Sequence, residues 1–259
     1  MVILSLPERA HLKMMIRRRA VVVGLCRPCD TVLFYAGADS TFAVKVLLEI
    51  YLFTMSFDLF NRDFFTPSAS IVAPQILGHY LLRRVEGKWC GGIIVETEAY
   101  IKDDPACHAY IRGRTLRTPR VKVLWGRPGH AYVYVIYGMY HCFNVACCPE
   151  GMAEAVLVRA IAPTHELEIM QQNRHVSALR QLTNGPGKLC AAMAMDRDLD
   201  GEDLCDIKSE VIIAKNPDRE SIVSELGSIA IGPRIGLKVA ADWPLRFGLK
   251  DSEFLSKKF

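Results

Sequence analysis

The stretch AYVYVIYGMYHCFNVA, residues 131–146, indicates the fold class more clearly than any other part of this 259-residue chain. From Ala131 to Tyr137, the side chains of Tyr132, Tyr134 and Ile136 alternate with those of Val133, Val135 and Tyr137. A period of two is the pattern of a β-strand, in which each set lies on one face. Gly138 marks a turn, and a second strand is expected from Cys142 to Ala146. The sequence therefore predicts a β-hairpin with an aromatic tip.

Segments on both sides of this hairpin show a mixture of strand and helix patterns. Further strands are expected at Tyr80–Val85, Cys90–Thr97, Glu154–Ile161, Ile229–Val239 and Leu245–Gly248. Helices are expected at His165–Gln172, at Gly187–Met195 and at Ser68–Leu77, the last one kinked or shortened by Pro74. This mixture predicts the α+β fold class.

Length and composition indicate one globular domain with an N-terminal appendage. Apolar residues make up 51% of the chain and charged residues 23%, so it can bury a sizeable core. Neither a repeat nor a low-complexity linker follows Phe57, so residues 57–259 are predicted to form one domain. Residues 1–55 form an N-terminal extension that we expect to pack poorly or not at all. Disorder, a processed or regulatory leader and a mis-assigned start remain open for it.

A membrane span is not expected, although the 22 residues from Pro128 to Pro149 carry no charge. Their alternation, the turn signal at Gly138 and the polar Asn144 favour a sheet over a helix in lipid.

The cysteine pattern argues against both disulfides and a metal site. Nine cysteines are an odd number, and a chain of this length needs no disulfides to fold, which favours a reducing compartment. The cysteines and histidines of the hairpin do not show tetrahedral ligand spacing, so neither a metal nor another cofactor is expected.

Basic residues gather directly before the uncharged stretch. The net charge of +4 is too mild to indicate a polyanionic partner by itself. However, a run without any acid contains Arg112, Arg114, Arg117, Arg120, Lys122 and Arg127. A solvated loop before a core hairpin is the ordinary interpretation. Bases that bind phosphates beside a tyrosine-rich projection are also typical of nucleic-acid binding.

Two carboxylates end one of the predicted strands, in the segment VETEAY at residues 95–100. Glu96 and Glu98 are two residues apart and share a strand face with Tyr100, whereas Thr97 points to the other face. His108 follows after a short loop. A solvated pair of carboxylates is the common outcome for such a strand end, but the nearby ring and imidazole favour a reaction site.

At this point the sequence resembles the alkyladenine (3-methyladenine) DNA glycosylase family, from about Phe60 to Ser256. The motifs that carry the resemblance are RDFF at 62–65, VETEAY at 95–100, DPA at 104–106 with His108, GRT at 113–115, YVYVIYGM at 132–139 with Asn144, VLVRA at 156–160, NGPGKL at 184–189, RIG at 234–236 and PLRF at 244–247. The resemblance implies a single mixed domain with a curved antiparallel sheet core, flanking helices and a protruding DNA-intercalating hairpin.

The resemblance also implies roles for individual residues. Glu98, rather than the structural Glu96, matches the general base that directs water onto the sugar C1′, and Arg159 matches the residue that holds this water and a nearby phosphate. The base pocket is expected to contain Tyr100, His108, Tyr134, Asn144 and Ile235, with Asn144 rejecting normal guanine and the Ile235 carbonyl completing the water site. DNA intercalation and backbone contacts are expected from Tyr137, Met139, Tyr140, Arg114, Arg117 and Lys188.

The function implied is DNA base-excision repair. A monofunctional glycosylase of this type flips alkylated purines out of duplex DNA and hydrolyses the N-glycosidic bond, leaving an abasic site. The expected partner is double-stranded DNA with damaged purines, bound by a monomer. The expected location is inside the cell with the DNA, in the cytoplasm or nucleoid of a bacterium or in the nucleus of a eukaryote.

Two alternatives remain open. A lesion-recognising paralogue with weak catalysis is favoured by the loop from His108 to Trp125, where Ile111 is an insertion, Thr118 replaces a usual Asn and Trp125 a usual Phe. A carbohydrate hydrolase would use paired carboxylates, but a second acid at a suitable separation is missing.

Overall fold

The structure is a computed structural model that describes residues 57–111 and 113–259, together with four short strands near the N-terminus. The chain divides into two compact units, Met1–Ser56 and Phe57–Phe259, and each is described by itself. In the first unit, the described backbone forms two antiparallel pairs, β1 (Ile3–Ser5) with β2 (His11–Lys13) and β3 (Val21–Cys26) with β4 (Thr31–Tyr35). Apart from these four strands, residues 1–55 lie outside the described residues, so the prediction that they pack poorly stays a prediction.

The second unit is built on an eight-stranded antiparallel sheet. Its strands are β5 (Tyr80–Val85), β6 (Lys88–Tyr100), β9 (Ala131–Ile136), β10 (Tyr140–Cys147), β11 (Glu154–His165), β12 (Val211–Ala214), β13 (Ile229–Gly232) and β14 (Arg246–Leu249). The main path runs β12-β5-β6-β11-β10-β9. One edge of β6 pairs with β11 along most of its length, and the other edge pairs first with β5 and then with β14, which also pairs with β13. The C-terminal half of β6 therefore lies between β11 and β14.

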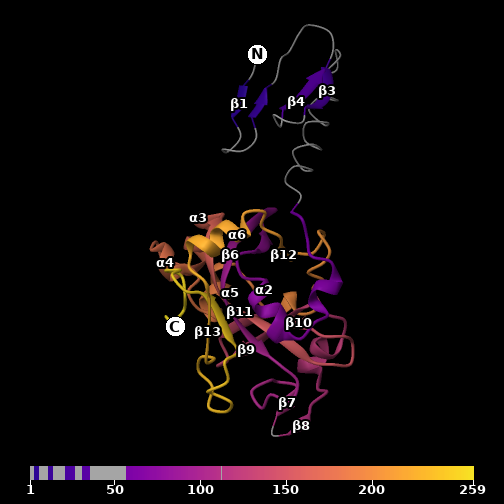
Figure 1. The fold of residues 1–259 in the computed structure, drawn as a ribbon, viewed down its shortest axis with the longest axis vertical. Coiled ribbons are helices and arrows are strands. Elements are labelled where there is room, and N and C mark those ends of the chain that lie inside the picture. The colour runs from indigo at the N-terminus through magenta and orange to yellow at the C-terminus, as the bar shows by residue number, and fades with distance from the viewer. Residues whose placement is uncertain (1–2, 6–10, 14–20, 27–30, 36–56, 112) are drawn as a thin grey trace. The chain divides into compact units, whose positions relative to one another are not determined.

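Short helices surround the sheet. They are α2 (Ala69–Gln75), α3 (Leu167–Arg174), α4 (Leu179–Leu182), α5 (Pro186–Ala192) and α6 (Arg219–Glu225), with 3₁₀ turns at Arg62–Phe65, Pro119–Trp125 and Arg197–Leu199. Figure 1 shows α3, α4 and α6 at one end of this unit and the small hairpin of β7 (Tyr110–Ile111) and β8 (Arg114–Thr115) at the other end. Within the described part of the chain, none of the helices has the length and apolar character needed to cross a bilayer.

The mixed α/β class with an antiparallel sheet is confirmed, and so is the strand assignment of the uncharged stretch. The β9–β10 turn is closed by the Met139 N–H, which donates to the Ile136 carbonyl at 3.3 Å. Both central residues have positive φ, +53° at Tyr137 and +72° at Gly138. Glycine adopts this conformation freely, whereas for tyrosine it is uncommon. The predicted helix from His165 begins instead at Leu167, because β11 continues through His165.

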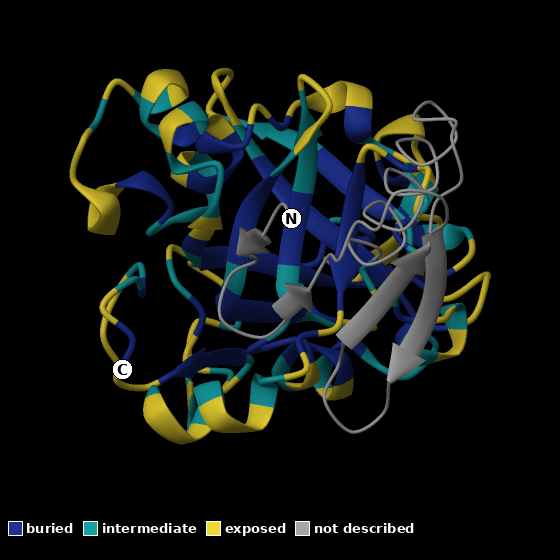
Figure 2. Cartoon of the chain, turned by 90° about the horizontal axis from the view of Figure 1, so that it is seen from above, coloured by how far each residue is buried: buried dark blue, intermediate teal, exposed yellow. Residues whose placement is uncertain are grey.

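One face of the sheet packs against α2. Ser68 caps this helix, and Pro74 lies near its end, where it shortens the helix as expected. The Thr97 hydroxyl donates to the Ala73 carbonyl at 2.9 Å, so Thr97 points to this face. The strands are buried at the centre, and the outward faces of the surrounding helices and loops are exposed (Figure 2).

The opposite face of the sheet is covered by the segment between β6 and β9. Tyr132 and Ala155 of the sheet form a second apolar cluster with Cys107, Tyr110, Val121 and Leu124 from that segment. This cluster closes part of the face and leaves the remainder to line a pocket.

We expect the free energy of unfolding to decrease as the pH falls from about 6.5 to about 4. Burial, with Arg219 and Lys215, lowers the pKa of His79 to about 4, and its Nδ1 accepts the Asn216 N–H at 2.9 Å. The unfolded chain then binds a proton in this range that the folded chain does not bind, so stability present above pH 6.5 is lost on acidification. Urea denaturation at several pH values measures this dependence.

The variant His79→Asn should make the pH dependence less steep, because an amide oxygen can accept the same bond without titrating, while the contribution of His108, whose pKa burial also lowers to about 4, remains. His175→Asn, at an exposed histidine, is the matched control. Parallel curves for wild type and His79→Asn would show that His79 does not cause the acid sensitivity.

Candidate active site

A pocket of about 620 Å³ opens on the second face of the sheet. Of the predicted site residues it is lined by Tyr100, His108, Tyr134, Tyr137, Tyr140, Asn144, Arg159, Lys188 and Ile235. Met139, Arg114, Arg117 and Glu98 do not line it. Glu98 is fully buried behind the wall, yet its oxygens bind three lining residues.

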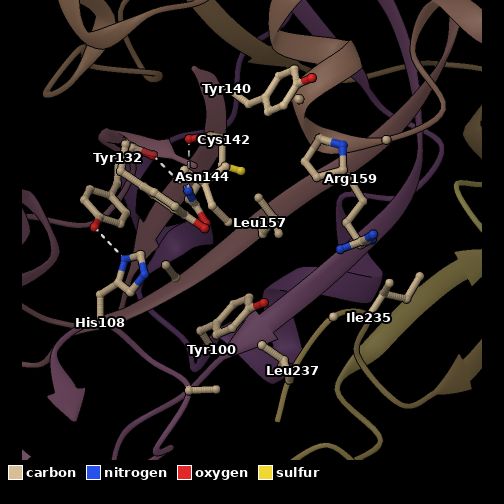
Figure 3. A pocket seen from close by; sticks show the side chains of 18 of the residues that line it. Tyr100, His108, Tyr132, Tyr140, Cys142, Asn144, Leu157, Arg159, Ile235 and Leu237 are labelled. Atoms are coloured by element: carbon tan, nitrogen blue, oxygen red, sulfur yellow. Dashed lines mark hydrogen bonds between the residues drawn. The ribbon is translucent and has the colours of Figure 1, made fainter. Parts of the chain in front are cut away.

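One side of the pocket is aromatic and uncharged. The rings of His108 and Tyr134 meet edge to face with centroids 4.5 Å apart, and His108 Nδ1 lies 2.8 Å from the Tyr132 hydroxyl (Figure 3). Burial and then Arg120 lower the pKa of His108 to about 4, and burial raises the pKa of Tyr132 to about 12. At neutral pH this side therefore presents neutral rings.

The other side holds a buried ion pair. Glu98 Oε1 lies 3.0 Å from Arg159 Nη1 and accepts the Ile235 N–H at 2.7 Å. Glu98 Oε2 accepts the Tyr100 hydroxyl at 2.9 Å. Burial and the charge of Glu98 raise the pKa of Tyr100 well above its usual value, so this hydroxyl keeps its proton and donates. Figure 3 shows the Tyr100 hydroxyl pointing toward the side where Arg159 and Ile235 lie.

A β-bulge places Arg159. In the pairing of β11 with β6, Val158 lies opposite Thr97 and Ala160 opposite Glu96, so Arg159 is the extra residue. A bulge redirects the side chain of its extra residue. Arg159 Nε lies 3.2 Å from Glu96 Oε1 while its Nη1 contacts Glu98, so one guanidinium bridges both carboxylates. The shared face expected for Glu96, Glu98 and Tyr100 is thereby confirmed.

A second buried ion pair holds the loops around Tyr100. Arg234 forms a two-pronged contact with Asp104, with Nη2 donating to Oδ1 at 3.0 Å, and both side chains are fully buried. The Arg234 guanidinium lies 4.6 Å from the centre of the Tyr100 ring and donates to the Ala99 carbonyl. Because Ile235 is the next residue, this pair fixes the backbone N–H that binds Glu98.

Asn144 is held rigidly in the pocket. Its Nδ2 donates to the Tyr132 carbonyl at 3.0 Å and to the Cys142 carbonyl at 3.4 Å. With the amide protons used in this way, the side chain cannot rotate aside without breaking both bonds.

The remaining predicted residues are exposed: Tyr137, Tyr140 and Lys188 line the pocket, whereas Met139, Arg114 and Arg117 do not. Tyr137 is 84% exposed, Met139 68% and Tyr140 48%. Arg114, Arg117 and Lys188 are exposed as well. Lys188 Nζ donates to Asn184 at 2.9 Å, and the Arg117 guanidinium lies 4.2 Å from the Trp125 ring centre, so both also make local contacts. Large exposed apolar side chains gathered beside bases are typical of a binding surface.

Sequence reasoning missed several pocket residues. Tyr132 was not among the residues expected to form the site, but its hydroxyl contacts His108; its position two residues before Tyr134, on the same strand face, was the available signal. Leu157 likewise shares its face with Arg159. No sequence pattern placed Arg174 near the site, because nothing local linked the helix α3 to the pocket that Arg174 lines. The Nε atom of Arg174 is buried without a hydrogen-bond partner among the described residues.

Metal ligation finds no support in the described part of the chain, where no three or more His, Cys, Asp or Glu side chains are grouped to hold an ion.

A pocket with neutral aromatic rings on one side and a buried carboxylate–guanidinium pair on the other suits a hydrolase that acts on a planar, ring-shaped group. The family model described as Methylpurine-DNA glycosylase (MPG) matches residues 63–253. The chain therefore belongs to the methylpurine-DNA glycosylase family, as the resemblance implied, and this membership implies hydrolysis of N-glycosyl bonds in DNA and a role in DNA repair.

Similar bacterial proteins carry the name "Putative 3-methyladenine DNA glycosylase". The one from Desulfitobacterium hafniense (strain Y51) is 43% identical over 210 residues, which cover 76% of this chain and 98% of the relative. The one from Carboxydothermus hydrogenoformans is 43% identical over 200 residues, 77% of this chain and 100% of the relative. The one from Rhodopseudomonas palustris (strain ATCC BAA-98 / CGA009) is 46% identical over 201 residues, 78% of this chain and 89% of the relative.

We expect Asp104→Ala to lower the free energy of unfolding by about 3–5 kcal/mol, because it leaves the buried Arg234 guanidinium without its counter-charge. Urea denaturation measures the loss. Asp58→Ala is the control: its partner Lys215 is 43% exposed and Asp58 itself 71%, so this change should cost less than about 1 kcal/mol. Equal losses for the two variants would contradict the importance given to the buried pair.

Proposed function

We propose that this protein is a monofunctional DNA glycosylase that flips alkylated purines of the 3-methyladenine type out of duplex DNA and hydrolyses their N-glycosidic bond. The observation that carries the proposal is the Glu98–Arg159 pair, 3.0 Å apart, at the wall of an aromatic pocket. The product is DNA with an abasic site, and neither a metal nor another cofactor takes part.

The aromatic side of the pocket binds the flipped base. An alkylated purine carries positive charge, and the electron-rich faces of tyrosine rings attract cations. Tyr100 and Tyr134 provide such rings, and the neutral His108 adds no positive charge of its own beside the base. Stacking of this kind partly offsets the cost of unstacking the nucleotide from the duplex.

The charged side of the pocket activates water. An ionised carboxylate offers about four lone-pair sites. In Glu98, three lone-pair sites accept hydrogen bonds from Arg159, Ile235 and Tyr100. The remaining site accepts the proton of the water molecule that attacks C1′. As the base leaves, the sugar gains oxocarbenium character, which the negative charge of Glu98 stabilises. The Arg159 guanidinium holds this water and a nearby phosphate. The Ile235 carbonyl accepts a further hydrogen bond from the water.

The exposed surface around the pocket holds the opened duplex. Tyr137 fills the gap left by the flipped nucleotide, flanked by Met139 and Tyr140. The positive φ of Tyr137 projects this side chain from the hairpin tip, and strain of this kind is often found at functional positions. Arg114, Arg117 and Lys188 bind phosphates, which makes the affinity dependent on salt.

Asn144 contributes selectivity by rejection. Its side-chain amide donates hydrogen bonds to two backbone carbonyls, which hold it in place. It therefore meets the exocyclic amine of normal guanine as a fixed obstacle.

A lesion-binding protein without catalysis is the alternative that the altered loop raised. In the structure, the unusual Trp125 is accommodated in the loop: its Nε1 donates to the Leu116 carbonyl at 2.8 Å, and its ring packs edge to face against Tyr110. Release of free base from alkylated DNA by the wild-type protein would exclude this alternative.

We expect Glu98→Gln to lower the single-turnover excision rate by at least about 100-fold, the lower end of what general base catalysis contributes. Binding to the same lesion-bearing duplex should change little, because the amide keeps the shape of the carboxyl group. Abasic sites are scored by alkaline cleavage, and binding is scored by fluorescence anisotropy. Glu150→Gln, at an exposed glutamate, is the matched control.

The proposal fails if Glu98→Gln excises as fast as wild type. A protein–DNA complex that is trapped covalently by borohydride would instead contradict the direct hydrolysis proposed, because it reveals attack by an amine.

We expect Tyr137→Ala to weaken binding to lesion-bearing duplex by about 1–3 kcal/mol, the usual value of an aromatic stacking contact with a base. Binding to a single-stranded oligonucleotide with the same lesion should change less, because there is no gap to fill. Fluorescence anisotropy measures both affinities. Ile71→Ala removes another exposed apolar side chain, on α2, and should leave both unchanged. Equal losses for duplex and single strand would contradict the gap-filling role.

A further inference from the structure

Glu96 is the most heavily hydrogen-bonded carboxylate near the site, although it does not line the pocket. It is fully buried. Its Oε1 accepts Arg159 Nε at 3.2 Å, Arg246 Nε at 2.7 Å and the Ser256 hydroxyl at 2.9 Å, and its Oε2 accepts the Ser256 N–H at 2.6 Å. Two of these four bonds come from one residue near the C-terminus.

Ser256 also contacts the guanidinium that bridges to Glu98. Its hydroxyl oxygen accepts Arg159 Nη2 at 3.2 Å and Nε at 3.4 Å, while the hydroxyl proton is donated to Glu96. One edge of the Arg159 guanidinium is thus held by Ser256 and Glu96, and Nη1 remains directed at Glu98. A long side chain has many rotamers, and it is these contacts that select one of them.

The C-terminal tail is itself anchored. The Arg246 guanidinium donates to the Lys257 carbonyl and lies 3.9 Å from the centre of the Phe259 ring. The same ring packs on Gly248, where a Cβ atom would come within 2.6 Å of it. The position of Ser256 is therefore set by β14 and by the residues that follow it.

We propose that Ser256, acting with Glu96, is a positioning residue for the reaction: it orients the Arg159 guanidinium toward Glu98, and through it the C-terminal tail takes part in building the active site. This inference rests on the proposed function for its kinetic consequence. Neither residue is placed to touch the substrate, so the effect is exerted through Arg159. Because serine is uncharged, its removal disturbs the orientation of Arg159 without changing the balance of buried charge.

The test compares wild type with Ser256→Ala, Ser256→Thr and the control Ser224→Ala, at an exposed serine. Three quantities are measured on the full chain: the single-turnover excision rate on a duplex with one alkylated purine, the affinity for the abasic product duplex, and the hydrogen-exchange rate of the Arg159 Nε–H by NMR. The Nε–H signal is assigned by its loss in Arg159→Lys.

We expect Ser256→Ala to lower the excision rate by about 10-fold, the effect of one hydrogen bond to a charged group, and to speed Nε–H exchange. Affinity for the abasic product should stay within about twofold, which a general loss of structure would not allow. Ser256→Thr, which keeps a hydroxyl, should restore most of the rate, and Ser224→Ala should behave as wild type.

The inference is overturned if Ser256→Ala folds and excises at the wild-type rate, or if its rate and product affinity fall together. If wild type itself releases no base, the proposed function fails, and the exchange rate decides alone: unchanged Nε–H exchange in Ser256→Ala overturns the positioning role. If Ser256→Ala does not fold, Ser256→Cys replaces it, since a thiol is a weaker hydrogen-bonding group of similar shape, and wild-type rate and exchange in that variant overturn the inference equally.

Discussion

The structure around the site depends on the balance of two buried carboxylates by two guanidiniums. Glu96 and Glu98 are both fully buried on one face of β6, and neither would be tolerated there without a partner. Arg159 arrives from β11 on one side and Arg246 from β14 on the other. The placement of β6 between these two strands, which also forces β5 and β14 to share one edge, is thus tied to the chemistry of the pocket.

The two faces of β6 have different roles. Thr97 points toward α2 and its hydroxyl is bonded to the helix, so this face belongs to the apolar core and holds the strand still. The opposite face is covered by loops that leave a pocket above Tyr100 and Tyr134. A site on a strand that is fixed from behind can keep its geometry while the loops in front of it accept a ligand.

The sequence predicted those features that depend on local periodicity. The period of two in residues 131–146 identified the hairpin, and the spacing of Glu96, Glu98 and Tyr100 placed them on one face, because strand periodicity needs no knowledge of neighbours. It did not predict β12, a four-residue apolar run without alternation, or α6, in which Ile222 and Val223 are only partly buried against the core. The bulge at Arg159 and the bonds from Ser256 to Glu96 depend on strand register and on contacts 97 and 160 residues apart in sequence, which local patterns do not record.

The separation of neutral and charged sides also bears on which bases the proposed reaction suits. A neutral purine leaves more easily when an acid protonates it. Among the described residues of the pocket, the pKa values of Tyr100, Tyr132 and Tyr134 are raised, and that of His108 is lowered, so at neutral pH none of the four is a good proton donor to a leaving base. A purine alkylated on a ring nitrogen already carries its positive charge and leaves as a neutral molecule. In the proposed reaction, such a base needs stacking on tyrosine and the action of the Glu98 carboxylate on the sugar, but no further proton donor from the pocket.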